Sequence, residues 1–110
     1  MAYDSELADR VQQLHGNWAA LRAKRMFGGI AYLLHGNMAF AVLGEALMVR
    51  CGPQRYAQCL AQEGVREFDL TGKVMKGWVL VSVDLLENEC ELRAWTGIGL
   101  DYAASLPAKL

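Results

Sequence analysis

The side chains that could carry chemistry in this chain are three cysteines and two histidines. Cys51, Cys59 and Cys90 are widely spaced, and neither His15 nor His35 stands at the distance from a cysteine that zinc sites use. The contexts of the cysteines are an apolar strand, a helix face and a helix start, in that order. We therefore expect free structural thiols, with no catalytic residue, no metal site and no cofactor.

Two glycine-containing segments match phosphate-binding loops only in part. Paired glycines such as Gly28-Gly29 can bind phosphate through backbone N–H groups, but here a strand rather than a helix is expected to follow. Gly72-Lys73 lacks the upstream glycine and the following Ser or Thr of a P-loop. The sequence therefore favours a bulge or a close backbone contact at the glycine pair.

Five basic side chains are the candidates for contact with nucleic acid or another anion. They are Arg22, Lys24 and Arg25, which precede an apolar strand, and Lys73 and Lys76, which flank an expected turn. A basic run can also form a solvated strand edge, where its charges discourage pairing between chains. Because the net charge is −1, we expect at most weak, salt-sensitive binding to nucleic acid.

A ligand-binding or enzymatic site is a further alternative, and it would lie near Tyr32, Arg50 or Cys51. A deep, polar-lined pocket that holds a thiol of perturbed pKa would support it. Because the sequence contains no catalytic set, we favour a non-catalytic regulatory or protein-interaction domain over both alternatives.

The composition indicates a single globular domain. Of the 110 residues, 54% are hydrophobic, which is enough to form a core and argues against disorder. No apolar run approaches the length of a membrane span, and the acidic residues 1–6 do not resemble a signal peptide. Together with the odd number of cysteines, these features predict a cytoplasmic protein that does not bind membranes.

The first element is expected to be a helix that begins after Asp4 or Ser5 and ends near Gly16. An apolar stripe at helical spacing follows the cap. Trp18 and Leu21 are then expected to anchor the connection from this helix to the core.

Two hairpins are expected next. Residues 29–35 and 38–44 are predicted strands, and Gly36-Asn37 between them fits a two-residue type II′ turn. A second turn that begins with glycine, Gly44-Glu45, leads into a third strand at residues 46–51. Both turns together predict an antiparallel meander of three strands.

The register of this meander assigns the apolar side chains to two faces. Leu33 pairs with Phe40, and Phe40 pairs with Val49, so these three share the face expected to be the core. The opposite face is also apolar, and soluble proteins seldom leave such a surface without a use. We expect it to bind a second copy, as a symmetric homodimer, or another protein. The expected interface residues are Ile30, Tyr32, Leu34, Leu43 and Met48.

The remaining chain predicts a helix, two strands and a last helix. Gly52-Pro53 starts the second helix, residues 65–70 and 78–83 are predicted strands, and Asn88 caps the C-terminal helix. The order α-β-β-β-α-β-β-α predicts an α+β two-layer sandwich with an antiparallel five-stranded sheet and helices.

Two glycines in the C-terminal helix bear on the second sheet face. Gly97 and Gly99 each cost roughly 1 kcal/mol relative to alanine inside a helix, and they would let it pack closely on another element. If this helix folds over the second face, it buries that face within one chain. This is the alternative to a partner or a homodimer.

Three blocks of residues, in this order, resemble the TfoX/Sxy N-terminal domain family. They are Arg25-Met26-Phe27-Gly28-Gly29 with residues 30–32 and Gly36-Asn37-Met38-Ala39; Leu47-Met48-Val49-Arg50 with Gly52-Pro53 and Tyr56; and residues 68–73 with 75–79. Residues 3–7 and the segment from Trp95 to Pro107 also fit, so the resemblance covers nearly the whole chain.

The resemblance implies a single domain over residues 1–110, with a fold similar to the α+β domains of type III secretion chaperones. It also implies a regulatory role, because full-length members in naturally transformable bacteria regulate competence genes. Those members carry a second, helical C-terminal domain, and this chain is expected to be a single-domain member that lacks it. The family supplies no catalytic residue, so the resemblance implies none here.

Overall fold

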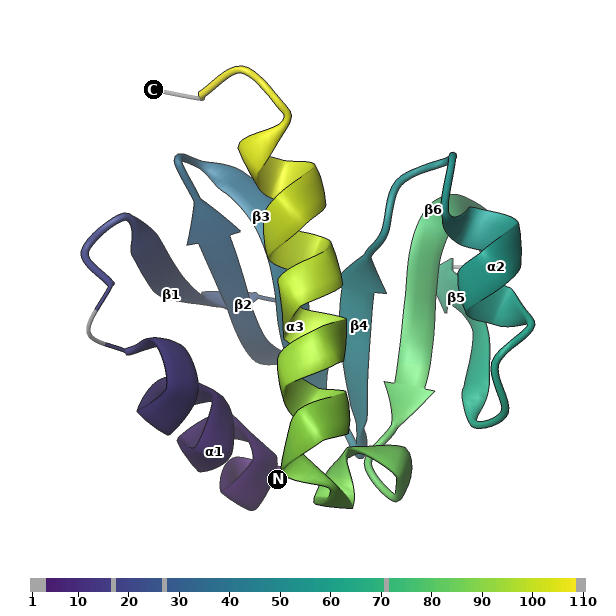
Figure 1. Ribbon diagram of the computed structural model, residues 1–110, viewed down its shortest axis with the longest axis horizontal. Helices are drawn as coiled ribbons and strands as arrows, with labels where there is room; N and C mark the ends of the chain where they lie inside the picture. The colour runs from purple at the N-terminus through teal and green to yellow at the C-terminus, as the bar shows by residue number, and fades with distance from the viewer. Residues whose placement is uncertain (1–3, 17, 27, 71, 109–110) are drawn as a thin grey trace.

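The computed structural model describes residues 4–16, 18–26, 28–70 and 72–108, which form three α-helices, six strands and one 3-10 helix (Figure 1). In chain order the elements are α1 (Ser5–His15), β1 (Leu21–Met26), β2 (Gly29–Leu34), β3 (Asn37–Leu43), β4 (Ala46–Arg50), α2 (Tyr56–Leu60), β5 (Val65–Leu70), β6 (Lys73–Ser82), η1 (Leu85–Glu87) and α3 (Glu89–Ala104). The described chain therefore has one strand more than predicted.

Strand β1 is absent from the predicted element order, although the interpretation of its basic run as a solvated strand edge is correct. It is rich in basic residues and exposed along most of its length, so it lacks the alternation that marks a half-buried strand. It nevertheless pairs with β2, from Leu21 opposite Leu34 to Met26 opposite Gly29. The sheet of the described residues thus has six antiparallel strands rather than five, in the order β1-β2-β3-β4-β6-β5.

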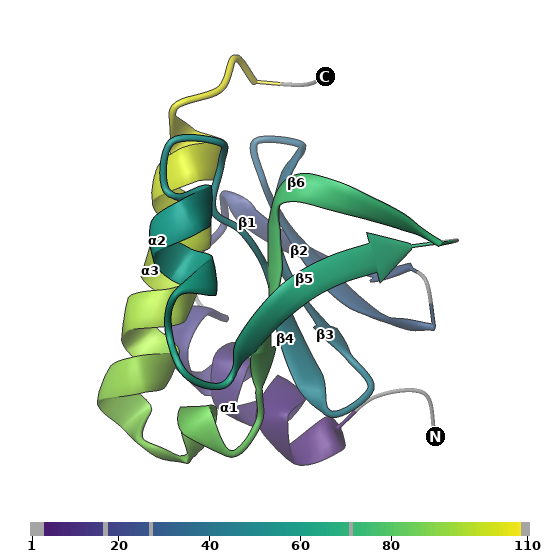
Figure 2. The ribbon, with the colours of Figure 1, turned by 90° about the vertical axis from the view of Figure 1, so that its right-hand side faces the viewer.

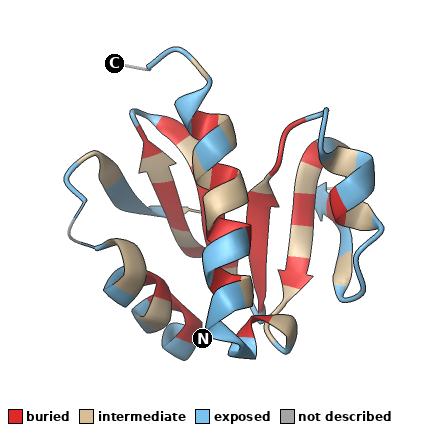
Figure 3. Ribbon diagram, viewed as in Figure 1, coloured by how far each residue is buried: buried red, intermediate tan, exposed pale blue. Residues whose placement is uncertain are grey.

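The helices pack against one side of the sheet (Figure 2). Leu7 and Val11 of α1, Cys59 of α2 and Leu92 of α3 belong to one buried cluster with that side of the strands. Strand β4 is central and buried except at Arg50, whereas β1 is largely exposed (Figure 3). The predicted α+β arrangement of helices on an antiparallel sheet is therefore confirmed, with the strand number corrected.

The first predicted hairpin is present, but its turn lies one residue earlier than expected. His35 and Gly36 form the turn, and both have a positive φ, of 52° and 83°. Two positive values indicate a type I′ turn rather than the predicted type II′. Asn37 is therefore the first residue of β3, paired with Leu34. Its side chain is buried, and Nδ2 donates a hydrogen bond to the Pro107 carbonyl oxygen at 2.9 Å.

This shift changes which side chains of β2 face the helices. Tyr32 pairs with Phe40, and Leu33 pairs with Met38, because Ala39 is an extra residue in the ladder. The predicted pairing of Leu33 with Phe40 is therefore wrong. The early turn and the bulge together move the register by one residue, which exchanges the two faces of β2.

The second hairpin has the predicted turn and register. Leu43 pairs with Ala46 across Gly44-Glu45, and Phe40 pairs with Val49. Gly44 has a φ of 55°, as a turn that begins with glycine requires. The faces predicted for the side chains of β4 are therefore correct.

Helix α3 crosses the sheet at the bulge of β3. A Cβ at Gly99 would overlap the carbonyl oxygen of Ala39, whereas a Cβ at Gly97 would meet nothing within 4 Å. Of the two glycines expected to permit close packing, Gly99 does so and Gly97 does not.

The glycine pair near β2 makes the close backbone contact predicted for it. A Cβ at Gly29 would overlap the carbonyl oxygen of Val42 on β3. Gly28 has a φ of 77° in the connection from β1 to β2. The expected anchoring role of Trp18 is wrong, because this side chain is 45% exposed, whereas Leu21 packs against the core.

Candidate functional site

The sheet face opposite the helices, called the open face below, carries a second apolar cluster. Its centre consists of Ala31, Ala41, Met48 and Phe68, which are buried. Seven partly buried residues surround this centre: Met26, Leu33, Met38, Leu43, Met75, Trp78 and Leu80. All of these residues come from strands. Figure 2 shows the hairpin of β5 and β6 reaching out on the side away from α2 and α3.

Two of the five predicted interface residues lie on the open face, and three do not. Leu43 and Met48 belong to the open-face cluster. Ile30, Tyr32 and Leu34 pack with the helix-covered core instead, because the shifted first hairpin exchanges the faces of β2. The assignment of these three residues to an exposed second face is therefore wrong.

Methionine is concentrated on the open face. All four methionines that the structure describes, Met26, Met38, Met48 and Met75, belong to its cluster. Methionine is unbranched and polarisable, so it adapts to surfaces of different shape and is frequent where one protein binds several partners. The composition of the cluster therefore suits binding better than it suits a rigid core.

The charged strand residues of the open face, within the described part of the chain, are all basic. Four of them, Arg22, Lys24, Arg50 and Arg66, each pair with a member of the open-face cluster. Residues that pair directly across two strands project to the same side of the sheet. Because β1 and β5 are the two edge strands, positive charge flanks the apolar centre on both sides.

One end of the open face is hollowed. The hollow measures about 440 Å³ and lies beside the turn between β3 and β4. Leu43 and Leu80 give it apolar walls, and Arg66 lines it from β5. Glu45 and Asp84, in the turns that close this end, also line it. The hollow is therefore suited to a large side chain that carries no negative charge.

Arg50, at the end of β4, lies between two aromatic rings. Its guanidinium carbon is 4.9 Å from the centre of the Trp78 ring and 5.3 Å from that of Tyr102 on α3. Cation–π contacts of this kind contribute about 0.5–1 kcal/mol each at exposed sites. They fix the position of one positive charge at the end of the open face.

A separate groove runs between α2 and α3. Two hollows of about 330 and 430 Å³ share Arg55 in their walls; Cys51 lines the first and Cys59 the second. Arg55 Nη1 lies 3.8 Å from Oδ2 of Asp101, and both side chains are well exposed. The groove is the place where a ligand site near Cys51 would lie, but Tyr32 lines neither hollow.

The thiols of this groove are protonated at neutral pH. Burial, and then the neighbouring Cys59 thiol, raise the pKa of Cys51 to about 12. Burial also raises the pKa of Cys59. Cys51 Sγ donates a hydrogen bond to the Gly77 carbonyl oxygen at 3.4 Å. Because the thiolate is the nucleophilic form, this environment does not support thiol catalysis.

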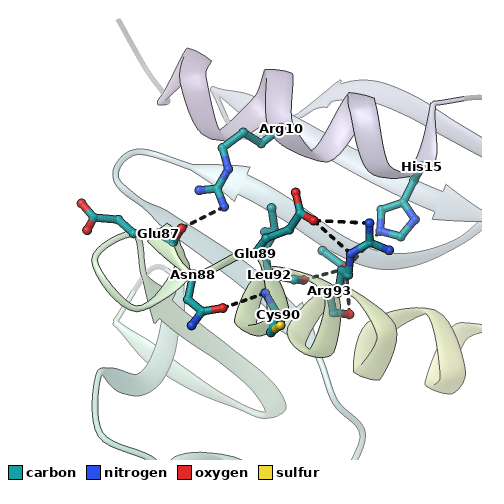
Figure 4. Close-up of polar contacts among 9 residues, drawn as sticks. Arg10, His15, Glu87, Asn88, Glu89, Cys90, Leu92 and Arg93 are labelled. Carbon is teal, nitrogen blue, oxygen red and sulfur yellow. Dashed lines mark hydrogen bonds and ion pairs between the residues drawn. The ribbon is translucent and has the colours of Figure 1, made fainter.

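His15 joins the end of α1 to α3. Its Nε2 lies 3.0 Å from Thr96 Oγ1, and the Thr96 hydroxyl donates to the Leu92 carbonyl oxygen at 2.8 Å. Arg93 lies beside this pair, 3.4 Å from Glu89 (Figure 4). Burial, and then the charge of Arg93, lower the pKa of His15.

The five basic residues considered for nucleic-acid contact do not share one surface. The register places Arg22 and Lys24 on the open face and Arg25 on the other side of the same strand. Lys73 and Lys76 lie on β6, which three strands separate from β1. A phosphate backbone needs a continuous basic track, and this distribution does not supply one.

Sequence reasoning missed most of the open-face residues. Valines alternate with other residues along the end of β6, and both Val79 and Val81 lie in the helix-covered core. The same alternation was a signal that Trp78 and Leu80 lie together on the other face. The pairing of β5 with β6 shifts between Glu67 and Asp69, however, and no local sequence signal marks that shift.

The described residues also bear on metal binding and on membrane spanning. Residues 4–16, 18–26, 28–70 and 72–108 contain no group of three or more His, Cys, Asp or Glu arranged to hold a metal ion. Within the same ranges, every helix is too short or too polar to span a membrane.

A comparison with protein-family models gives a match. The model of the TfoX N-terminal domain matches residues 12–103 of the 110. The match runs from within α1 to within α3, so it includes every strand that forms the open face. Comparison with curated proteins gave no match, and comparison with solved structures gave none.

Proposed function

The chain belongs to the TfoX N-terminal domain family, and on that premise we propose that it is a non-catalytic regulatory domain that acts by binding another protein. The family is associated with competence regulation, and control of competence or other genes is the process we propose. The open face carries the proposal, because it is apolar, rich in methionine and built only from strands. A partner would contact the seven partly buried residues around the buried centre, and methionine among them adapts to partners of different shape.

Contact with single-stranded nucleic acid is the second candidate, because basic side chains flank the open face. Proteins that bind single strands stack bases on accessible aromatic rings. Phe68 is only 6% exposed, and the guanidinium of Arg50 covers one face of Trp78 at 4.9 Å. These two rings therefore give little surface for stacking, and we favour a protein partner.

A second copy of the chain is the other protein that could occupy the open face. A symmetric pair would bring Arg22, Lys24, Arg50 and Arg66 of both copies to one interface. The described strands offer no carboxylate on this face, and Glu45 and Asp84 lie only in the turns at one end. Like charges would therefore meet over most of such an interface and oppose association. We therefore propose a different protein as the partner, with a homodimer as a measurable alternative.

Two neighbouring residues of β6 allow a matched test. Met75 belongs to the open-face cluster, whereas Val74 is 40% exposed and lies outside it. The wild type, Met75→Glu and Val74→Glu would each be immobilised and exposed to nuclease-treated extract of the source cells. We expect the wild type and Val74→Glu to retain the same protein, and Met75→Glu to retain it about tenfold less, because a buried carboxylate would face apolar contacts.

Light scattering and circular dichroism of the three proteins complete the experiment. A wild-type dimer that Met75→Glu dissociates would make a second copy the partner. Retention that depends on intact nucleic acid would support the second candidate. Equal retention of the protein by all three folded variants would contradict the proposed site.

A further inference from the structure

The charge distribution on the open face indicates which kind of partner fits it. We propose that this face binds an amphipathic helix with acidic residues along both flanks, presented by the partner protein; this inference rests on the proposed function. Arg22 and Lys24 lie on edge strand β1, and Arg66 lies on edge strand β5. The apolar cluster lies between these two edges.

An α-helix matches this arrangement in shape. A helix with one apolar stripe would place that stripe on the methionine-rich cluster and its two polar flanks beside the basic edges. The molecule extends 32 × 30 × 28 Å, and a helix rises 1.5 Å per residue, so about 20 residues would span the face. Acidic flanks would complement the charge on both sides.

An added β-strand would fit less well. A strand from a partner has to pair with an edge of the sheet, and the basic residues of β1 discourage such pairing. The methionines Met38 and Met48 lie on the interior strands β3 and β4, beyond the reach of a strand that pairs at an edge. An element that lies on top of the sheet reaches Met38 directly, whereas Met48 is buried in the centre of the cluster.

The hollow at one end of the open face determines where the acidic residues of the partner can lie. Glu45 and Asp84 line this end, so a carboxylate of the partner would be repelled there. Leu43 and Leu80 would instead receive a large apolar side chain. The acidic residues of the partner are therefore expected beside Arg22 and Lys24. Near Arg66, they are expected on the side away from the turns that carry Glu45 and Asp84.

Three fluorescently labelled peptides of about 20 residues test this inference with the full chain. The first is an amphipathic helix with leucines on one face and glutamates on both flanks. The second replaces each glutamate by lysine, and the third scrambles the first. We expect the first to bind at micromolar concentration and the other two at least about tenfold more weakly, as measured by fluorescence anisotropy.

Neighbouring residues of β1 provide the matched variants. Lys24 and Arg25 are both exposed, but the register puts Lys24 on the open face and Arg25 on the other. We expect Lys24→Glu to weaken binding of the acidic helix about fivefold to tenfold, and Arg25→Glu to change it less than about twofold. Added salt should weaken binding to the wild type more than to Lys24→Glu.

Several results would overturn the inference. They are equal binding of the lysine peptide, equal binding of the scrambled peptide, equal effects of Lys24→Glu and Arg25→Glu, and no binding at about 100 µM peptide. Failure here is distinguishable from failure of the proposed function, because the Met75→Glu test measures retention of a cellular protein. A protein retained there without acidic-helix binding here would leave the proposed function standing.

Discussion

At the scale of single residues, His15 couples folding to protonation. Burial, and then the charge of Arg93, lower its pKa from the ordinary value of 6.5. As pH falls below 6.5, the unfolded chain therefore takes up a proton at this residue more readily than the folded chain does. The free energy of unfolding consequently decreases as pH is lowered through this range, and the contribution of His15 is constant above it.

We expect His15→Gln to remove this part of the pH dependence. Glutamine retains a donor for Thr96 and cannot gain a charge beside Arg93. Urea unfolding between about pH 5 and pH 8 measures the effect. His35→Asn is the control, because asparagine tolerates the positive φ of the turn. Unchanged pH dependence in His15→Gln would contradict the assignment.

The cysteines should differ sharply in reactivity. Cys90 is exposed, whereas Cys51 and Cys59 are buried. With a pKa of about 12, Cys51 is thiolate in about one molecule in ten thousand at pH 8. We expect a disulfide reagent to label one thiol rapidly and two slowly, and Cys90→Ser to abolish the rapid phase. A rapid phase that persists in Cys90→Ser would instead support the ligand or enzyme alternative.

At the scale of elements, α3 is fixed to the sheet at several points. Gly99 contacts the backbone of Ala39, and Tyr102 contacts Arg50. Beyond the helix, the Pro107 carbonyl oxygen accepts the hydrogen bond of Asn37. The C-terminal segment therefore stabilises the first hairpin in the register that determines the composition of the open face.

The two glycines of α3 should respond oppositely to alanine. Gly97→Ala adds a methyl group in open space, so it should raise the free energy of unfolding by up to about 1 kcal/mol through helix propensity. Gly99→Ala overlaps the Ala39 carbonyl oxygen, so it should lower the free energy of unfolding by about 1–3 kcal/mol. Urea unfolding followed by circular dichroism measures both, and a stabilised Gly99→Ala would refute the close contact.

At the scale of the whole molecule, the sheet separates two apolar clusters of different character. The helix-covered cluster contains fully buried leucines, valines and Phe40. The open-face cluster contains the four described methionines, and its residues outside the buried centre are only partly buried. A close-packed core on one side of the sheet thus supports unbranched, adaptable methionine side chains on the other.

Features that depend on short-range rules follow from the local sequence. Asp4 caps α1 by accepting a hydrogen bond from the Leu7 backbone N–H at 3.0 Å. Asn88 caps α3 in the same way, through the Cys90 N–H at 2.8 Å. The Gly44-Glu45 turn fixed the register of β3 and β4. Each of these depends on residues within a few positions of one another, so propensity and spacing were sufficient.

Long-range packing selects which residues of β2 belong to the open face. The turn lies at His35-Gly36 instead of the predicted Gly36-Asn37, and the bulge at Ala39 lies where Gly99 of α3 packs on β3. Strand β1 also depends on a contact with another element. Its residues do not alternate between buried and exposed, and it forms by pairing with the edge of β2. A change of register by one residue exchanges the two faces of a strand, so long-range packing determined the composition of the site.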